Sequence, residues 1–372
     1  MSRGSIVDRV TAGLPDAVGG VPLDQFRVPV GLVLVVLLLR PVIADPRMAG
    51  YPQLANTILI WMLFAASFNL LLGYTGLLSF GHAMFFGIGA YAAAVGLTRF
   101  GLPWVAAAAA GLVLSAAAAY VVARLIVQKG EIYFAMLTLA FAQAVHYVAN
   151  QDPAGLTGGT TGITGASPAW LVSERGTKFV HVAGVQFDWY ALLAVVFVVA
   201  MLAIWQVVRS PFGRSLVAIR ENATLARSMG MNVDRYKVWA FTFAGLFAAL
   251  AGVLVEVNNQ GATLQLLSLS VSGDVILMTI LGGSVFFFGP LAGAFVWLFA
   301  EDFLTGFNTL VLPLTELPMA RIGLSGVLTY WQFFLGLLFV IVVLLSPREG
   351  IWGLLRRAVA RVVALLGGGE GQ

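Results

Sequence analysis

Long apolar segments follow one another along nearly the whole chain, and they constrain its fold more than any other feature. A helix that crosses a lipid bilayer needs about 20 mostly apolar residues. Ten segments approach this length and composition: 28–43, 53–72, 80–97, 103–127, 131–149, 189–208, 238–257, 269–283, 287–304 and 331–345. We therefore predict an all-α, polytopic membrane bundle with about ten transmembrane segments, some of them broken or re-entrant.

The composition supports burial in lipid. Of the 372 residues, 60% are hydrophobic and 10% are charged, whereas a soluble domain carries about 25% charged residues. The net charge is +4, but the basic residues stand between apolar segments and form no continuous patch, which argues against nucleic-acid binding. The chain has no cysteine, which excludes disulfides, thiolate metal sites and a cysteine nucleophile.

The distribution of arginine and lysine predicts the orientation, because cytoplasmic loops are enriched in both. Ten spans with both termini in the cytoplasm place most basic residues inside. If 269–304 formed one helix instead of a hairpin broken near 284–286, the C-terminal arginines would lie outside. The predicted regions are a cytoplasmic segment (1–27), a transmembrane domain (28–346) with an outer loop (150–188) and a cytoplasmic coupling loop (209–237), and a cytoplasmic tail (347–372).

The first apolar segment allows two interpretations. Residues 42–44 resemble a signal-peptide cleavage site, but the 27 residues before the segment include three aspartates and are long for the charged start of a signal peptide. A retained signal-anchor helix is therefore favoured.

The cytoplasmic segment 209–237 is the most informative stretch. Ser210 before Pro211 suits a helix start, and Gly230 is a plausible stop. Between them, apolar and basic residues alternate in a way that suits short amphipathic helices. Two interpretations remain open: a solvated loop rich in positive charge, or a helix that docks into a cleft on a cytoplasmic partner.

Four blocks of this sequence resemble LivM-type permeases, which are subunits of branched-chain amino acid ABC importers. The blocks are 220–232 (RENATLARSMGMN), 73–91 (GYTGLLSFGHAMFFGIGAY), 156–163 (LTGGTTGI) and 279–290 (TILGGSVFFFGP). The resemblance implies half of a translocation pore in a bacterial or archaeal cytoplasmic membrane, with no cofactor. It also implies as partners a second, LivH-type permease subunit, two ATP-binding subunits and an extracytoplasmic substrate-binding protein. The residues that the resemblance assigns to coupling with the ATPase are Arg220, Glu221, Ala226, Arg227, Ser228, Met229 and Gly230.

The block 73–91 is apolar but interrupted by Gly73, Gly76, Gly81, Gly87 and Gly89. Irregular backbone at membrane depth must be buried in protein or line a cavity, and glycines also let helices pack closely. Both interpretations stay open. The residues that we place near a substrate path are Tyr74, Thr75, Gly76, Ser79, His82, Phe86, Gly87, Thr138 and Gln143. A second set of structural breaks is expected at Gly282, Gly283, Gly289 and Pro290.

His82 and Glu256 are the ionisable residues that the spans would carry inside. Intramembrane ionisable groups are costly and often functional, yet a neutral histidine can also donate a structural hydrogen bond, so for His82 we weigh pore lining against that role. Glu256 ends its apolar segment beside two asparagines, and we expect it at the membrane interface.

Several functions are disfavoured by what the sequence lacks. A Walker A loop needs a lysine followed by Ser or Thr, but the three lysines precede Gly130, Phe179 and Val238. Any ATP hydrolysis must therefore belong to another polypeptide, and no metal motif or catalytic cluster indicates an enzyme. Two alternatives remain: the same architecture carrying urea, short amides or aromatic acids, and a self-sufficient secondary transporter or channel, which would need paired buried charges.

Overall fold

The computed structural model describes residues 17–18, 21–22, 27–44, 53–166, 168, 170–174, 177–182, 185–306, 309–312, 315–318, 331–347 and 349–367. The helices within them are α2 (Arg27–Ala44), α3 (Gln53–Thr75), α4 (His82–Thr98), α5 (Trp104–Ile126), α6 (Glu131–Gln151), α7 (Trp189–Arg209), α8 (Pro211–Glu221), α9 (Ala223–Ser228), α10 (Val233–Asn259), α11 (Leu269–Gly282), α12 (Gly289–Gly306), α14 (Trp331–Leu345) and α15 (Gly350–Gly367). Each predicted apolar segment coincides with one of these helices. Most of the predicted N-terminal segment 1–27 and residues 368–372 lie outside the described residues.

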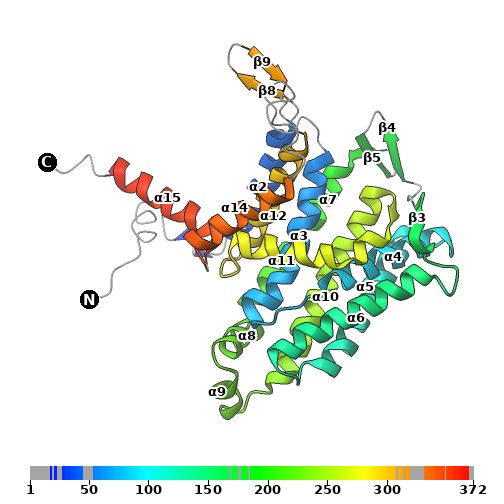
Figure 1. The fold of residues 1–372 in the computed structure, drawn as a ribbon, viewed down its shortest axis with the longest axis horizontal. Helices are drawn as coiled ribbons and strands as arrows, with labels where there is room; N and C mark the ends of the chain where they lie inside the picture. The colour runs from blue at the N-terminus through cyan, green and yellow to red at the C-terminus, as the bar shows by residue number, and fades with distance from the viewer. Residues whose placement is uncertain are drawn as a thin grey trace.

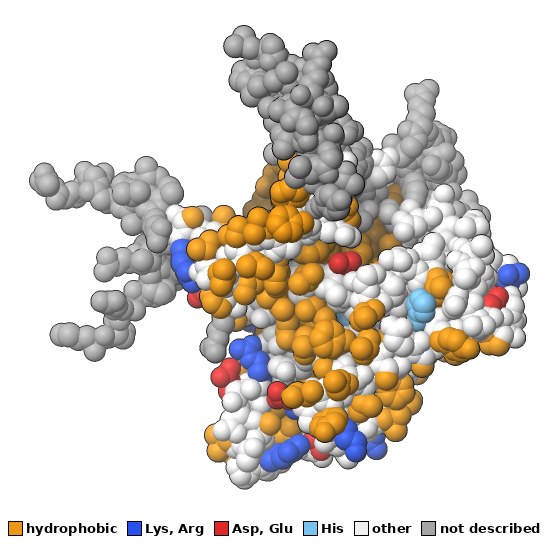
Figure 2. Space-filling view, in the orientation of Figure 1, with side chains coloured by type: hydrophobic (Ala, Val, Ile, Leu, Met, Phe, Trp, Pro, Cys, Tyr) orange, Lys and Arg blue, Asp and Glu red, His pale blue; other side chains and the backbone are white. Residues whose placement is uncertain are grey.

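The helices form a membrane bundle. In the described part of the chain, α3, α5, α6, α7 and α10 are each long and apolar enough to cross a bilayer. The helices α14 and α15, which meet at a 61° bend, would add a sixth span if they act as one. The ends of α8 and α9 lie at one extremity of the bundle, where Lys and Arg side chains gather below a broad hydrophobic face (Figures 1 and 2). The number of spans and the orientation stay predictions.

The chain is mainly helical, as predicted, and its connecting loops also contain short strands that were not predicted. The strands are β1 (Ala17–Val18), β2 (Val21–Pro22), β3 (Ile163–Thr164), β4 (Leu171–Glu174), β5 (Thr177–Val182), β6 (Val185–Asp188), β7 (Gly261–Ala262), β8 (Thr309–Leu312) and β9 (Thr315–Pro318). The order β4-β5-β6 makes an antiparallel sheet in the predicted outer loop, and the same loop is tied to the end of α10 by β3 and β7. Loop segments rich in valine and threonine favour this extended structure.

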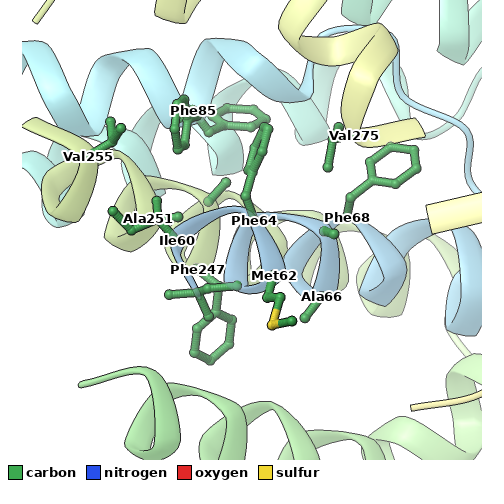
Figure 3. Packing of buried hydrophobic residues seen from close by; sticks show 14 of the residues in the cluster. Ile60, Met62, Phe64, Ala66, Phe68, Phe85, Phe247, Ala251, Val255 and Val275 are labelled. Atoms are coloured by element: carbon green, nitrogen blue, oxygen red, sulfur yellow. The ribbon is translucent and has the colours of Figure 1, made fainter. Parts of the chain in front are cut away.

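The core is built around α3 and α10. Of the most apolar 18 residues of each helix, 89% are buried in α3 and 78% in α10, but only 33% in α5 and α7. Figure 3 shows Phe64 and Phe68 on one side of α3, towards Phe85 of α4 and Val275 of α11, and Met62 on the other side. The inner helices are thus wrapped by protein, and the outer ones are left to face lipid or partner subunits.

Close approach of helix backbones explains many glycines. A methyl group on Gly252 of α10 would lie 1.9 Å from the Phe86 carbonyl oxygen of α4, and one on Gly89 would lie 2.4 Å from the Ala249 carbonyl oxygen. Gly87 and Gly89 are inside α4, so they are packing residues. The expectation that they interrupt the helix is wrong. Gly89 lets α4 touch α10, and Gly87 makes room for Leu267, which precedes α11.

The segment 269–304 is a hairpin, as the charge argument favours, and the single-helix alternative is wrong. The helices α11 and α12 are separated by residues 283–288, and a methyl group on Gly293 would lie 1.8 Å from the Met278 carbonyl oxygen. Gly283 has φ 102°, a conformation that side-chain-bearing residues rarely adopt, while Gly289 and Pro290 start α12. Trp352 of α15 stacks on Phe288 beside this break, so part of the predicted tail is a helix packed on the bundle.

The first helix is joined to the same bundle. Arg40 of α2 forms an ion pair with Asp188, the N-cap of α7, and the Tyr190 hydroxyl donates a hydrogen bond to the Val36 carbonyl oxygen at 2.5 Å. That the first helix is retained stays a prediction.

Candidate coupling and translocation site

An irregular segment, residues 76–81, separates α3 from α4 and forms the centre of the candidate site. Gly76 starts it with φ 75°, a left-handed conformation for which glycine is the default residue. The Leu77 N–H donates to the Leu71 carbonyl oxygen at 3.0 Å, which closes the end of α3. The break predicted within 73–91 is therefore present, but it is confined to these six residues.

Two neighbouring helices hold this segment, which we call the α3–α4 break. The Phe80 N–H donates to the Thr138 hydroxyl of α6 at 3.1 Å, and the Ala83 N–H donates to the Ser272 hydroxyl of α11 at 3.0 Å. A methyl group on Gly81 would lie 2.1 Å from the Thr138 carbonyl oxygen. Thr138 thus contacts the predicted path segment directly, whereas Ser272 was missed, since a lone serine in an apolar run carries no signal.

The third contact comes from the predicted coupling loop. The Arg220 guanidinium of α8 donates a hydrogen bond to the Gly73 carbonyl oxygen, in the last turn of α3. A cation at this place also interacts favourably with the negative end of the helix dipole. The Arg220 stem passes Gly76 so closely that a methyl group there would lie 2.9 Å from Arg220 Cγ. Arg220 therefore faces inward, and Glu221 lies beside it at 3.4 Å.

The helices α8 and α9 are consecutive short helices, and each begins at a residue whose side chain caps it. Ser210 accepts from the Gly213 N–H at 3.3 Å, and Asn222 accepts from the Leu225 N–H at 2.9 Å. Ala226 is buried against Ile219 and Val233. The helix start predicted at Ser210 is confirmed, whereas the cap at Asn222 was not singled out, although Asn is also a preferred N-cap.

The remaining predicted coupling residues face outward. Arg227 forms an ion pair with Asp234 at 2.8 Å, and its side chain is more than half exposed. Ser228 is exposed, Met229 is 74% exposed, and Gly230 has φ 86° with open space around it. An apolar side chain this exposed at the tip of a loop is available to a partner.

His82 lies in an aromatic cage in the core. Its Nε2 is 3.0 Å from the Ser67 hydroxyl, which in turn donates to the Phe64 carbonyl oxygen at 2.7 Å. Because that hydroxyl has one hydrogen, His82 must donate from Nε2. The ring stacks on Phe64 with centroids 5.3 Å apart, and His82 is 0% exposed. These contacts suit the structural role, and pore lining stays a prediction.

The other residues that we predicted near the substrate path differ in how much of them is exposed to solvent. Thr75, Ser79, Phe86, Gly87 and Thr138 are buried, Tyr74 and Gly76 are half-buried, and Gln143 is exposed. Phe80, which the sequence reading did not single out, is 37% exposed in the middle of the α3–α4 break. If two chains form a pore, the accessible residues of one chain are those that can face it.

Glu256 is buried within its own chain, and its expected place at the membrane interface stays a prediction. It is 0% exposed, and neither carboxylate oxygen has a hydrogen-bond partner among the described residues. The pair of β3 and β7 follows the end of α10 and helps to bury this carboxyl group, which the sequence does not predict.

We expect Glu256→Gln to raise the thermal stability of the purified chain. An unpaired carboxylate is more costly to bury than a carboxamide, and a gain of about 1 kcal/mol raises the midpoint by about 1 °C in a chain of this size. A thermal melt in detergent measures this, with the exposed Glu221→Gln as the control. A lowered midpoint for Glu256→Gln would mean that the carboxyl group makes a stabilising contact.

Asp152 organises the start of the predicted outer loop. It caps α6 in a left-handed conformation with φ 46°, and its carboxylate accepts from the backbone N–H groups of Leu156 at 2.6 Å, Thr157 at 2.8 Å and Gly158 at 3.0 Å. These bonds, led by the one from Thr157, hold the pKa of Asp152 below its usual range. The carboxylate thereby fixes the glycine- and threonine-rich block that follows.

We expect Asp152→Ala to release this turn, so that the backbone amides of residues 156–158 exchange hydrogen faster. The exchange rate in Asp152→Asn should lie between those of wild type and Asp152→Ala. Because the pKa is lowered on folding, the stabilisation is complete above the usual aspartate pKa of about 3.9. The stabilisation is lost as pH falls through the lowered pKa of the folded state. The protection of these amides against hydrogen exchange in the wild type should therefore not change between pH 8 and pH 5. Equal exchange in wild type and Asp152→Ala would contradict this role.

Among the described residues, no group of three or more His, Cys, Asp or Glu side chains could hold a metal ion. That no metal or cofactor is needed stays a prediction. The candidate site is thus defined by its helix contacts and its accessible face.

Comparisons with known proteins agree with this architecture. Residues 51–343 match the family described as "Branched-chain amino acid transport system / permease component". The chain is 28% identical over 305 residues to the high-affinity branched-chain amino acid transport system permease protein LivM of Salmonella typhimurium, covering 77% of this chain and 71% of that protein. The LivM protein of Escherichia coli matches to the same extent.

Another relative matches a shorter part of the chain and has a different name. The autoinducer 2 import system permease protein LsrC of Klebsiella pneumoniae is 34% identical over 166 residues, covering 42% of this chain and 40% of that protein. No solved structure matches the chain. With a family match that spans most of its length and a fold built of apolar helices, this multi-pass membrane protein belongs to the family of permease components of branched-chain amino acid transport systems.

Proposed function

We propose that this chain forms one half of the translocation pore of an ATP-driven importer for branched-chain amino acids in a bacterial or archaeal cytoplasmic membrane. Family membership and the LivM relatives support the cargo. The single observation that carries the mechanism is the contact of Arg220, in the predicted coupling loop, with the last turn of α3 beside the α3–α4 break.

Other subunits complete the transporter. A second permease of the LivH type would supply the other half of the pore, two ATP-binding subunits would bind the coupling loops, and an extracytoplasmic binding protein would deliver substrate. The exposed tip formed by Arg227, Ser228 and Met229 suits the docking role, because docked loops need accessible side chains and Arg220 and Ala226 are engaged with their own chain.

Movement of α8 would reach both breaks of the bundle. Arg220 holds the Gly73 carbonyl group, and a methyl group on Gly73 would lie 2.3 Å from the Ser284 carbonyl oxygen in the α11–α12 break. Packed backbones this close move together, because no soft side chain lies between them. A shift of α8 driven by the ATP-binding subunits would therefore displace the ends of α3 and α11 together.

The chain itself allows a labelling test of path and orientation, because it has no cysteine. Introduced cysteines at Met229 and Phe100, both well exposed, should react with a membrane-impermeant thiol reagent from opposite sides of the membrane, Met229→Cys from the cytoplasm. Phe80→Cys and Gln143→Cys should be protected by leucine in the assembled transporter, whereas the buried His82→Cys should not react. Labelling of Met229→Cys from outside would reverse the proposed orientation.

The decisive functional experiment is co-purification of the chain with the products of neighbouring genes, followed by ATPase and leucine-uptake assays in liposomes. We expect leucine uptake that requires ATP and all subunits. Competition by urea, short amides, aromatic acids or autoinducer 2 tests the alternative cargoes. Failure of the double variant Gly230→Trp, Arg220→Glu to weaken assembly or ATPase stimulation would contradict docking at this loop.

A self-sufficient secondary transporter is the weaker candidate. It needs paired buried charges as ion or proton relays, and within the described chain His82 and Glu256 each lack a charged partner. Leucine uptake by the chain alone, driven by an ion gradient, would support this candidate instead.

A further inference from the structure

A polar pocket opens between α5 and α10, at the end of the bundle that carries α8 and α9. Its volume is about 370 Å³, and its lining includes Tyr120, Arg124 and Gln128 from the α5 side and Asn232, Arg235 and Trp239 from the α10 side. None of these residues takes part in the Arg220 contact or the α3–α4 break. The pocket is therefore separate from the site described above.

The pocket is positively charged. Its acidic residue, Asp234, is already paired with Arg227 at 2.8 Å. In the part of the chain that the structure describes, Arg124 and Arg235 form no ion pair. Another acidic residue near this end, Glu131, interacts electrostatically with Lys237. Two guanidinium groups and two side-chain amides thus face an open space without a counter-ion.

The two helices present the same gradient of side chains towards this end. Along α5 the order is Val113, Tyr120 and Arg124, with Gln128 in the turn after the helix; along α10 it is Phe243, Trp239 and Arg235, with Asn232 as the N-cap before the helix. Each order runs from apolar through aromatic and cationic to amide, and the spacings place the helical residues on one face. Val113 is 66% exposed and Trp239 42% exposed. Aromatic residues followed by arginine are typical of the membrane–water interface.

An apolar groove adjoins the pocket through Trp239. Its volume is about 600 Å³, its lining includes Ala203, Val207, Phe212 and Phe243, and Trp239 belongs to both cavities. The aromatic rings connect the two, with centroids 5.9 Å apart for Tyr120 and Trp239 and 6.0 Å apart for Trp239 and Phe243. A ligand that fits both cavities has an anionic head and an apolar chain.

We propose that this pocket binds the phosphate-bearing headgroup of an anionic glycerophospholipid, with Arg124 and Arg235 on the phosphate and one acyl chain in the groove beside Trp239. Arginine is suited to phosphate because its planar fork donates two parallel hydrogen bonds. Basic pockets between transmembrane helices on the cytoplasmic side are of the kind that binds lipid headgroups. The proposal does not rest on the transport function, since its ligand belongs to the bilayer.

The test compares lipid retention by the full chain in nanodiscs made from equal parts of phosphatidylglycerol and phosphatidylcholine. Native mass spectrometry after release measures which lipid stays bound, and quenching of Trp239 by brominated acyl chains locates it, with Trp239→Phe as the reference. We expect phosphatidylglycerol to be retained preferentially. The double variant Arg124→Gln, Arg235→Gln should lower this preference about 30-fold, because each arginine contributes about a fivefold effect. The control, Arg214→Gln with Arg356→Gln, removes the same charge at residues outside the pocket and should keep the preference.

Four results would overturn the proposal. They are equal retention of the two lipids, equal loss in the control variant, displacement of phosphatidylglycerol by millimolar inorganic phosphate, and absence of the lipid from the assembled transporter. The third would indicate a simple anion site, and the last would indicate that a protein subunit covers the pocket. Thermal melts of both double variants separate loss of binding from loss of folding.

Discussion

Gly252→Ala is expected to lower the free energy of unfolding by about 3 kcal/mol, the upper range for overpacking a well-packed core. The new methyl group would lie 1.9 Å from the Phe86 carbonyl oxygen and 3.1 Å from the Ala90 nitrogen. Both neighbours are helix backbone, so α4 and α10 must separate to accommodate it. Because α10 is one of the two central helices of the bundle, that separation also loosens the packing of α5 on both.

The bundle offers matched controls for this change. Gly273 of α11 and Gly336 of α14 are also helical, but a methyl group at either position meets nothing within 4 Å among the described atoms. Alanine there should be neutral or stabilising by up to about 1 kcal/mol, because glycine is the poorer helix former. Thermal melts and yields of monodisperse protein in detergent report the difference. Similar melting for Gly252→Ala and the two controls would mean that the helices are not as close as described.

Arg220→Gln is expected to abolish most leucine transport while leaving the assembled complex and its ATP hydrolysis in place. Removal of a hydrogen bond from a charged group costs about 1.5–3 kcal/mol, and about 1.4 kcal/mol corresponds to a factor of ten in rate. Leucine moved per ATP hydrolysed should therefore fall by roughly ten- to a hundredfold. The physical reason is that the Gly73 carbonyl group is held by this guanidinium.

Conservative and control variants separate this coupling role from docking. Arg220→Lys keeps a cation beside the end of α3 and should restore part of the transport, and Gly76→Ala should reduce it, because of its strained φ of 75° and the nearby Arg220 stem. The exposed Arg214 on the same helix is the matched control, and Arg214→Gln should behave as wild type. An unchanged ratio of leucine to ATP in Arg220→Gln would refute the coupling contact, and loss of the ATP-binding subunits would point to docking instead.

Local sequence patterns predict the elements of this protein well. The apolar segments coincide with helices, since each depends on composition over about 20 residues. Ser210, Asn222 and Asn232 cap the helices that follow them, because capping is settled within one turn. The glycines also predicted the break before His82, and the placement of arginine and lysine predicted the hairpin at 283–288.

The burial and contacts of residues that depend on partners distant in the sequence were not predicted as well. The burial of Glu256 within the protein was not predicted. Gly87 and Gly89 were expected to break a helix, but they lie inside α4, where Gly89 lets it touch α10 and Gly87 packs against Leu267. Ser272 and Phe80 were not singled out, although one holds the α3–α4 break and the other is its exposed aromatic residue. The strands of the loops were missed as well, because their pairing joins segments such as 163–164 and 261–262.

The sequence by itself determined that this chain is a helical membrane protein and where along the chain its long apolar helices lie. These properties depend on hydropathy, charge and capping, which act over short stretches. Only the tertiary structure decided that Arg220 points inward to Gly73, that His82 is bound to Ser67, and that Arg124 and Arg235 share one pocket. Each of these contacts joins residues on different helices, and the direction in which a side chain points across a bundle depends on how the helices pack.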